Sequence, residues 1–149
     1  MQKFALFALA LAISSPALAE PVGRWLSGFG QGTFEYGIKN DSVGSDEVYI
    51  ACAEDNTYIS FTVGGVSPRQ GSNIIMTIGP DEFVVMAGKN GYFQTASHVD
   101  ADNFHALWDA MRAGQNLRVR LSTGQSTNFT LKGAAKVLPK APCKTDFAR

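Results

Sequence analysis

Apolar residues recur at every second position in a series of short runs along this chain, with polar or small residues between them. In residues 34–38, for example, Phe, Tyr and Ile alternate with Glu and Gly. This period is typical of a β-strand with one buried face. Gly, Pro, Asn and Asp separate the runs, which indicates tight turns. The predicted strands are residues 34–38, 48–52, 58–63, 73–78, 82–87, 92–97, 117–121 and 127–131.

One segment has the period of a helix instead. Its apolar residues fall at positions i, i+3, i+4 and i+7, and they are Phe104, Leu107, Trp108 and Met111. This spacing predicts an amphipathic helix at about 102–113. Asp100 or Asp102 can cap its start, and Gly114 follows its last turn, where a left-handed residue is favoured. A second, short helix is predicted at residues 133–138.

These elements predict a mainly β protein. Short strands with turns between them favour an antiparallel β-sandwich or an open barrel, here with one amphipathic helix and a short C-terminal helix. Trp25, Phe29 and Phe34 lie near the start of this region. In so small a domain we expect all three in the core, the alternative being an exposed aromatic patch for a partner.

The first nineteen residues have the layout of a secretory signal peptide. A short cationic start with Lys3 precedes an apolar run, and Ala17-Leu18-Ala19 supplies small residues for cleavage. The apolar run is shorter than the roughly 20 residues that cross a bilayer. We therefore expect residues 1–19 to be removed and residues 20–149 to form a single exported domain, periplasmic in a Gram-negative cell or secreted.

The charge balance narrows the classes of partner that the protein is expected to bind. The chain has 13 Lys and Arg against 13 Asp and Glu, and only Lys3 is lost with the signal peptide. The exported part therefore carries a net charge of about −1, without the clustered basic surface that binds nucleic acid. No second apolar stretch is long enough to cross a membrane. We expect no nucleic-acid partner and no membrane insertion after signal cleavage.

The two cysteines, Cys52 and Cys143, both lie in the predicted exported part. An even count in an exported chain favours a disulfide. A pair of free thiols and half of a metal site are the alternatives, although the spacing fits neither a zinc motif nor a C-x-x-C redox pair.

Candidate catalytic and metal chemistry is sparse. A metal site could be drawn from the cluster of His98, Asp100, Asp102 and His105, but a capped helix start with a surface histidine is the favoured interpretation. The sequence has no G-x-S-x-G motif for nucleophilic catalysis. Two carboxylates could still face each other across a sheet, as in glycoside hydrolases. We expect no enzyme activity, no cofactor and no metal.

Two surface features are candidate partner-binding sites. The loop at residues 64–72 is polar and rich in Gly and Pro, and its Ser67, Arg69 and Gln70 are the candidate contacts. Arg118 and Arg120 alternate with apolar residues on one strand, so they form a two-guanidinium face that can contact an anion or a partner. An ordinary solvated sheet face is the favoured interpretation of this pair, and the contact remains the candidate.

Two segments carry a resemblance to a known family. Residues 48–52 (VYIAC) and 56–59 (NTYI) combine a cysteine-bearing strand, a short turn and a return strand. Residues 129–135 (FTLKGAA) have the form F-x-L-x-G-small-small and are followed by an apolar pair and Cys143. Over about residues 46–143 this combination resembles the type VI secretion-associated periplasmic proteins of the VasI/TagO type.

The second half is also similar to the invasion-associated locus B family, another exported bacterial group with a similar F-x-L-x-G segment. Both resemblances imply a small β-sandwich in a Gram-negative cell envelope, with Cys52 and Cys143 as a structural disulfide and no catalytic residues to carry over. We therefore expect a non-enzymatic periplasmic binding or accessory protein that contacts a protein of the envelope or secretion machinery. The alternative is an inhibitor or immunity protein that blocks a cell-wall hydrolase or toxin, with the loop at 64–72 as its plug.

Overall fold

The structure of the chain is a computed structural model that describes residues 22–41, 43–54, 56–145 and 147. The predicted signal peptide, residues 1–19, lies outside the described residues.

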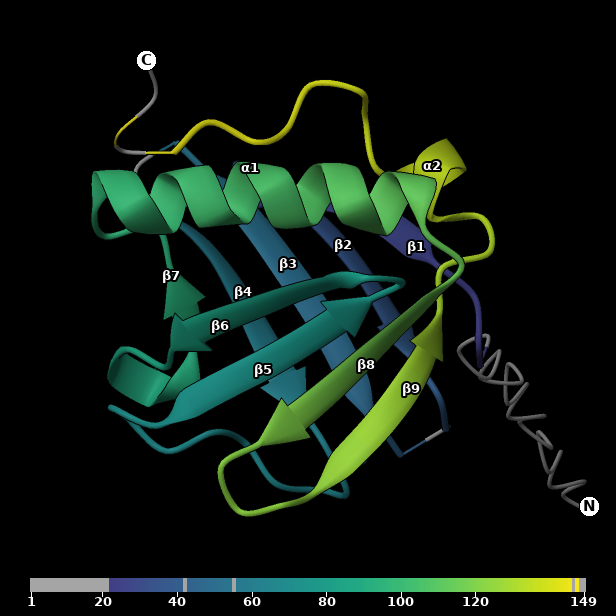
Figure 1. The fold of residues 1–149 in the computed structure, drawn as a ribbon. Helices are drawn as coiled ribbons and strands as arrows, with labels where there is room; N and C mark the ends of the chain where they lie inside the picture. Colours follow the sequence, from purple (N-terminus) through teal and green to yellow (C-terminus); the bar gives the residue numbers. More distant parts are fainter. Residues whose placement is uncertain (1–21, 42, 55, 146, 148–149) are drawn as a thin grey trace, which may run out of the picture.

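Two antiparallel sheets make up most of the fold (Figure 1). The first sheet has the order β1-β2-β3-β4-β7, with β1 (Leu26–Gly30), β2 (Thr33–Lys39), β3 (Glu47–Ala53), β4 (Asn56–Thr62) and β7 (Phe93–Gln94). The second has the order β6-β5-β8-β9, with β5 (Asn73–Ile78), β6 (Asp81–Met86), β8 (Asn116–Leu121) and β9 (Ser126–Thr130). A 3₁₀ turn, η1 (Lys89–Gly91), and two helices, α1 (His98–Ala113) and α2 (Ala134–Val137), complete the described elements.

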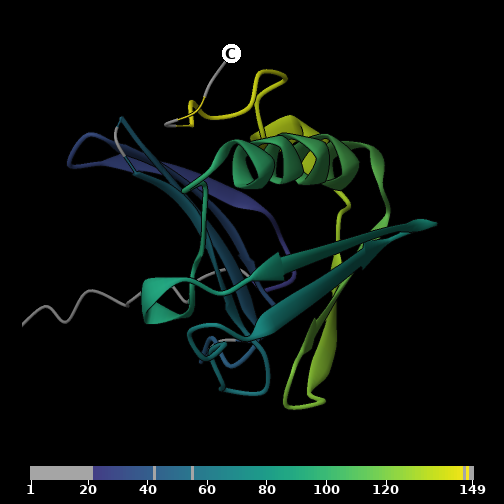
Figure 2. The same cartoon turned by 60° about the vertical axis from the view of Figure 1, so that its left-hand side comes forward.

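The two sheets do not close into a barrel. They diverge from one end, and α1 lies across the opposite end, between their upper parts (Figure 2). Their inner faces and the apolar stripe of α1 share one core of buried side chains. The mainly β prediction is confirmed, since the described residues form two antiparallel sheets with one main helix and a short C-terminal helix, and no closed barrel.

Trp108 of α1 is the largest fully buried side chain in this core. Its ring makes an edge-to-face contact with Tyr36 of β2, with centroids 5.5 Å apart. Because a buried indole N–H needs an acceptor, Trp108 Nε1 donates to the carbonyl oxygen of Pro139 at 2.9 Å. The helix is thereby joined both to the first sheet and to the C-terminal segment.

Side-chain hydrogen bonds join the two sheets where β9 runs beside the start of the first sheet. Trp25 Nε1 donates to the carbonyl oxygen of Thr130 at 2.9 Å. Asn40 Nδ2 donates to the carbonyl oxygen of Asn128 at 2.9 Å, which adds a second link to β9. The burial of Trp25 confirms the core position predicted for it.

The strand β1 was not among the predicted strands. Leu26–Gly30 contains two glycines and one serine, so its apolar alternation is too sparse to be recognised. The sequence signal for β1 is the Gln31-Gly32 pair that follows it. These two residues form a two-residue turn in which both have positive φ, at 51° and 79°. That conformation closes tight hairpins and here pairs Gly30 with Thr33.

The main helix begins earlier than predicted, at His98 and not at about 102. Its N-cap is Ser97, whose side chain accepts from the Asp100 N–H at 3.1 Å, so the prediction of Asp100 or Asp102 as the cap is wrong. Serine is an equally good cap, and the apolar stripe simply begins one turn inside the helix. The predicted strand at 92–97 is also shorter, and only Phe93–Gln94 pairs.

Gly114 ends the helix for a reason other than the predicted one. Its φ of −80° and ψ of 177° are extended and not left-handed. A Cβ placed on Gly114 would lie 2.4 Å from Cγ2 of Ile78 and 3.0 Å from Cδ1 of Leu131. The glycine is therefore required by close packing of the helix end against β5 and against Leu131, which follows β9.

The C-terminal segment returns to the first sheet after α2, which confirms the predicted short helix. Cys143 forms a disulfide with Cys52 of β3, with the two Cα atoms 5.7 Å apart. Thr57 Oγ1 of β4 donates to the carbonyl oxygen of Lys144 at 2.7 Å. The disulfide favoured by the cysteine count is thus present, and it closes a separation of 91 residues.

Replacing both Cys52 and Cys143 by Ala should lower the free energy of unfolding by about 2–5 kcal/mol, because the disulfide restricts the unfolded chain. Urea unfolding of the two proteins measures this loss. In the exported wild-type protein, alkylation without reductant should leave the intact mass unchanged. Alkylation of both thiols under those conditions would show that the bridge does not form.

Gly114→Ala should destabilise the protein by about 1–3 kcal/mol, because its methyl group overpacks against Ile78 and Leu131. Gly30→Ala is the matched control, since a Cβ there meets nothing within 4 Å and its φ is not positive. Its effect should stay within about 0.5 kcal/mol. Equal thermal unfolding midpoints for the two variants would contradict the packing role of Gly114.

Candidate functional site

Two exposed phenylalanines stand side by side on the hairpin of β1 and β2. Phe29 is 65% exposed and Phe34 is 54% exposed. The strand register pairs them directly, and their ring centroids lie 4.6 Å apart. The core position predicted for both residues is therefore wrong. Phe34 does share the inward face with buried Tyr36 and Ile38, but it lies at the hairpin end of β2, where it stays exposed.

A hollow of about 470 Å³ lies beside Phe34, between the hairpin and the C-terminal segment. We call it, together with Phe29, the aromatic hollow. It is lined by Gly32, Phe34, Tyr36, Cys52, Ala53, Glu54, Pro139, Ala141, Pro142, Cys143 and Lys144. One wall is therefore β2 and β3, and the other is the segment that the disulfide attaches to them.

The lining of the aromatic hollow is apolar in the middle and charged at the margin. Pro139 and Ala141 are exposed beside the phenylalanine, while Glu54 and Lys144 are exposed polar residues of opposite charge. The disulfide and the hydrogen bond from Thr57 to Lys144 fix the wall that carries them. Such a surface can hold an apolar side chain without rearranging its own backbone.

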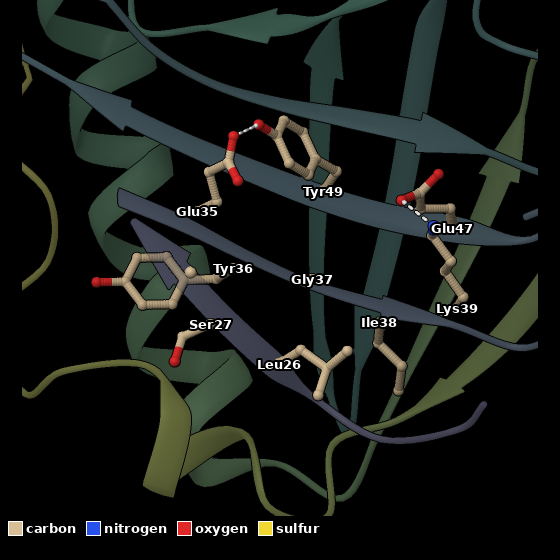
Figure 3. A pocket seen from close by; sticks show the side chains of 10 residues that line it. Leu26, Ser27, Glu35, Tyr36, Gly37, Ile38, Lys39, Glu47 and Tyr49 are labelled. Atoms are coloured by element: carbon tan, nitrogen blue, oxygen red, sulfur yellow. Dashed lines mark hydrogen bonds and ion pairs between the residues drawn. The ribbon is translucent and has the colours of Figure 1, made fainter. Parts of the chain in front are cut away.

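A second feature lies on the opposite, outer face of the first sheet. Two hollows of about 300 Å³ and about 500 Å³ adjoin there, and Glu35 and Tyr49 line both of them. We call this pair of hollows the sheet groove. Figure 3 shows the smaller one, with Glu35 and Tyr49 pointing toward each other from neighbouring strands and the ion pair of Lys39 and Glu47 at its other end.

The centre of the sheet groove is a fixed polar pair. Tyr49 Oη donates to Glu35 Oε1 at 2.6 Å. Burial, followed by this hydrogen bond and the negative charge of Glu35, raises the pKa of Tyr49 well above its ordinary value. The phenol therefore stays protonated at neutral pH and keeps donating. The carboxylate is thereby held in one orientation with its second oxygen able to accept.

Two further tyrosines extend this cluster along the sheet. Tyr58 of β4 lies 6.2 Å from Tyr49, between ring centroids, and stacks on Tyr92 at 4.7 Å with an interplanar angle of 7°. Burial raises the pKa of Tyr58, and the neighbouring Tyr92 and Glu35 add to the rise. Since Tyr92 holds one face of the Tyr58 ring, that ring forms a rigid wall of the larger hollow.

The sequence pattern contains a signal for the sheet groove that the search for polar and charged site residues does not detect. Strict alternation places Tyr49 and Tyr58 on the outward face of their strands, where polar residues are expected. Gly37 and Ala51 are on the same face, and the strand register sets Gly37 beside Tyr49 and Ala51 beside Tyr58. Large aromatic rings next to very small residues leave a hollow between them.

The predicted partner-binding residues occupy two places. Ser67, Arg69 and Gln70 are exposed in the loop that leads from the first sheet to the second. Gln70 lines a hollow of about 300 Å³ near the start of α1. The buried Pro68 fixes the loop, because a Cβ on Gly91 would lie only 2.2 Å from the Pro68 oxygen. The loop therefore packs against η1 at Pro68, while Ser67, Arg69 and Gln70 remain exposed.

Arg118 and Arg120 are exposed on the outer face of the second sheet, as their alternation predicts. Arg118 Nη2 donates to Ser126 Oγ of β9 at 3.4 Å. Among the described residues, no hydrogen bond or ion pair connects either arginine to the predicted loop contacts at 67–70. The structure therefore does not assemble the five predicted residues into one site.

The histidine and aspartate cluster is arranged as a helix start. Asp100 accepts from Ser97 Oγ at 2.7 Å, and His98 meets the ring of Phe147 edge-on, with centroids 4.9 Å apart. His105 lies about two turns after His98, against Phe104. Within the described part of the chain, no three His, Cys, Asp or Glu side chains are grouped as metal ligands.

None of the helices in the described part of the chain is long and apolar enough to cross a membrane.

Comparison with known proteins places the chain in a family. No curated protein and no solved structure matches it. The model of the family described as YfjT matches residues 23–138, which include both sheets, α1 and the sheet groove but stop before Cys143. The chain therefore belongs to the YfjT family.

Proposed function

We propose that this chain is a non-enzymatic binding protein of the Gram-negative cell envelope that captures a protein partner at the aromatic hollow. The observation that carries the proposal is the pair of exposed phenylalanines, Phe29 and Phe34, beside a hollow walled by Pro139, Ala141 and Pro142. Among the large hydrophobic side chains that are exposed in the described residues, these two are the aromatic ones, and they adjoin each other.

The chemistry of the hollow suits a protein partner. Interface centres are rich in aromatic residues and poor in charge, while their margins are polar. Phe29 and Phe34 supply an apolar centre, and Glu54 and Lys144 supply a margin with both signs of charge. An apolar side chain of the partner would fill the hollow, and its neighbours would meet the charged margin.

The hollow is also preorganised. The disulfide and the hydrogen bond from Trp108 to Pro139 hold the C-terminal wall at both of its ends. A surface that is already fixed loses little conformational entropy when it binds. This supports binding without a disorder-to-order step in this chain.

The envelope location rests on the export signal predicted at residues 1–19 and on the disulfide, which persists in oxidising compartments. The resemblance to periplasmic proteins of the VasI/TagO type also favours a Gram-negative periplasm and a partner in the secretion machinery.

An inhibitor or immunity protein is the second candidate. It is favoured by one observation, namely that the turn joining β1 and β2 reaches out past α1 in Figure 2 and carries Phe29 and Phe34 close to its end. A projecting hairpin can enter the cleft of a cell-wall hydrolase or toxin. The hairpin would then replace the loop at 64–72 as the plug.

Replacing Phe29 and Phe34 together by Ser should abolish partner capture. The exported, tagged protein is crosslinked in its native envelope, and the captured protein is identified and then titrated in purified form. We expect the double variant to weaken this binding at least 100-fold, because aromatic residues at interface centres cost about 2 kcal/mol or more each when truncated. Both residues are exposed, so folding should be retained.

Val99→Ser is the matched control, since Val99 is 68% exposed on α1, away from the hollow. It should bind like the wild type. Binding of the double variant that equals the control, or an empty capture with wild-type protein, would contradict the proposal. Inhibition of a captured hydrolase at saturation would select the second candidate, and unchanged hydrolase turnover would exclude it.

A further inference from the structure

The sheet groove has a floor made of very small residues. Gly30 of β1, Gly37 of β2 and Ala51 of β3 all face outward between larger neighbours. From Thr33 to Lys39 the groove follows one strand of seven residues, whose ends are about 20 Å apart at the rise of a β-strand. The groove is thus long, shallow and open along its length, which suits a linear ligand.

The walls combine aromatic rings with planar hydrogen-bonding groups. Tyr49 and Tyr58 supply the rings, and the carboxylate of Glu35 with the amides of Gln31 and Asn56 supplies donors and acceptors around the larger hollow. An aromatic ring accepts the C–H face of a pyranose by apolar contact, while planar amides and carboxylates bond to adjacent hydroxyl groups. The larger hollow of the sheet groove therefore offers both kinds of contact.

The charges in the groove disfavour an anionic ligand. Lys39 Nζ lies 3.8 Å from Glu47 Oε1, so these two groups offset each other. Glu35 remains as the central charge, and it already accepts from Tyr49. An anionic ligand would be repelled by this carboxylate, whereas a sugar hydroxyl can donate to its second oxygen.

A peptide strand fits this surface poorly. Peptides that extend a sheet need a free edge with unpaired backbone groups. The groove lies over β2 and β3, which are paired on both sides within the sheet. The backbone groups of β2 and β3 are already used, so recognition over these two strands depends on side chains alone.

From this combination of floor, walls and charge we propose that the sheet groove binds a neutral linear oligosaccharide. Tyr58, held from behind by Tyr92, is the stacking platform, and Glu35, held by Tyr49, accepts hydrogen bonds from sugar hydroxyls. This site is on the opposite face of the sheet from the aromatic hollow, so it goes beyond the proposed function and does not depend on it.

Binding is measured with the purified exported protein and an array of neutral linear oligosaccharides that includes chitotetraose and cellotetraose, followed by calorimetric titration of the best probe. We expect saturable binding that Tyr58→Ala and Glu35→Gln each weaken at least tenfold. Gly30→Leu should weaken it as well, because Gly30 lines the larger hollow and a Cβ placed there meets no other atom within 4 Å.

Arg120→Ala is the control, because Arg120 lies on the outer face of the other sheet, and it should bind like the wild type. Thermal unfolding of every variant verifies that each one is folded. Absence of binding across the array would overturn the proposal. So would binding that Tyr58→Ala leaves unchanged, or a stronger response to a lysine-rich peptide used as the competing probe.

Discussion

The attachment of the C-terminal segment to the first sheet is the constraint on which the rest of the structure depends. Cys143 is bonded to Cys52, and Trp108 and Arg112 of α1 donate to the carbonyl oxygens of Pro139 and Leu138. These links hold the helix, the segment and the first sheet together at the end of the fold where α1 lies between the separated sheets. Without these links, the C-terminal segment would not connect the end of α1 to the hairpin of β1 and β2.

This attachment also explains why the two candidate sites coexist in so small a fold. The segment covers part of the inward face of β2 and β3 and leaves the aromatic hollow, while the outward face of the same strands carries the sheet groove. Ala53 lines both of them. A rigid pair of strands can therefore carry the proposed protein-binding surface on one side and the proposed oligosaccharide groove on the other.

Much of the fold could be predicted from the sequence, because burial sets the period of two in the strands and the period near 3.6 in α1. The hairpin of β3 and β4 and the buried stripe from Phe104 to Met111 follow from that rule. The rule does not reveal where burial stops. Phe34 continues the pattern of Tyr36 and Ile38 but lies at the exposed end of its strand, and glycine-rich β1 has almost no pattern.

The candidate sites were harder to predict than the fold, because both depend on contacts between residues distant in sequence. Phe29 becomes notable only when Phe34 is beside it and Pro139 lies across from the pair. Tyr58 becomes a platform only through Tyr92, which follows after the whole of β5 and β6. The loop at 64–72 has the composition of a recognition loop, yet the buried Pro68 fixes it.

Hydrogen exchange of the backbone amides, with and without the captured protein partner, tests the central claim most directly. The account predicts that the partner slows exchange at residues 26–36 and 139–145, and that exchange in the loop at 64–72 stays unchanged. Protection confined to that loop or to the strand with Arg118 and Arg120, with none around Phe29 and Phe34, would contradict it.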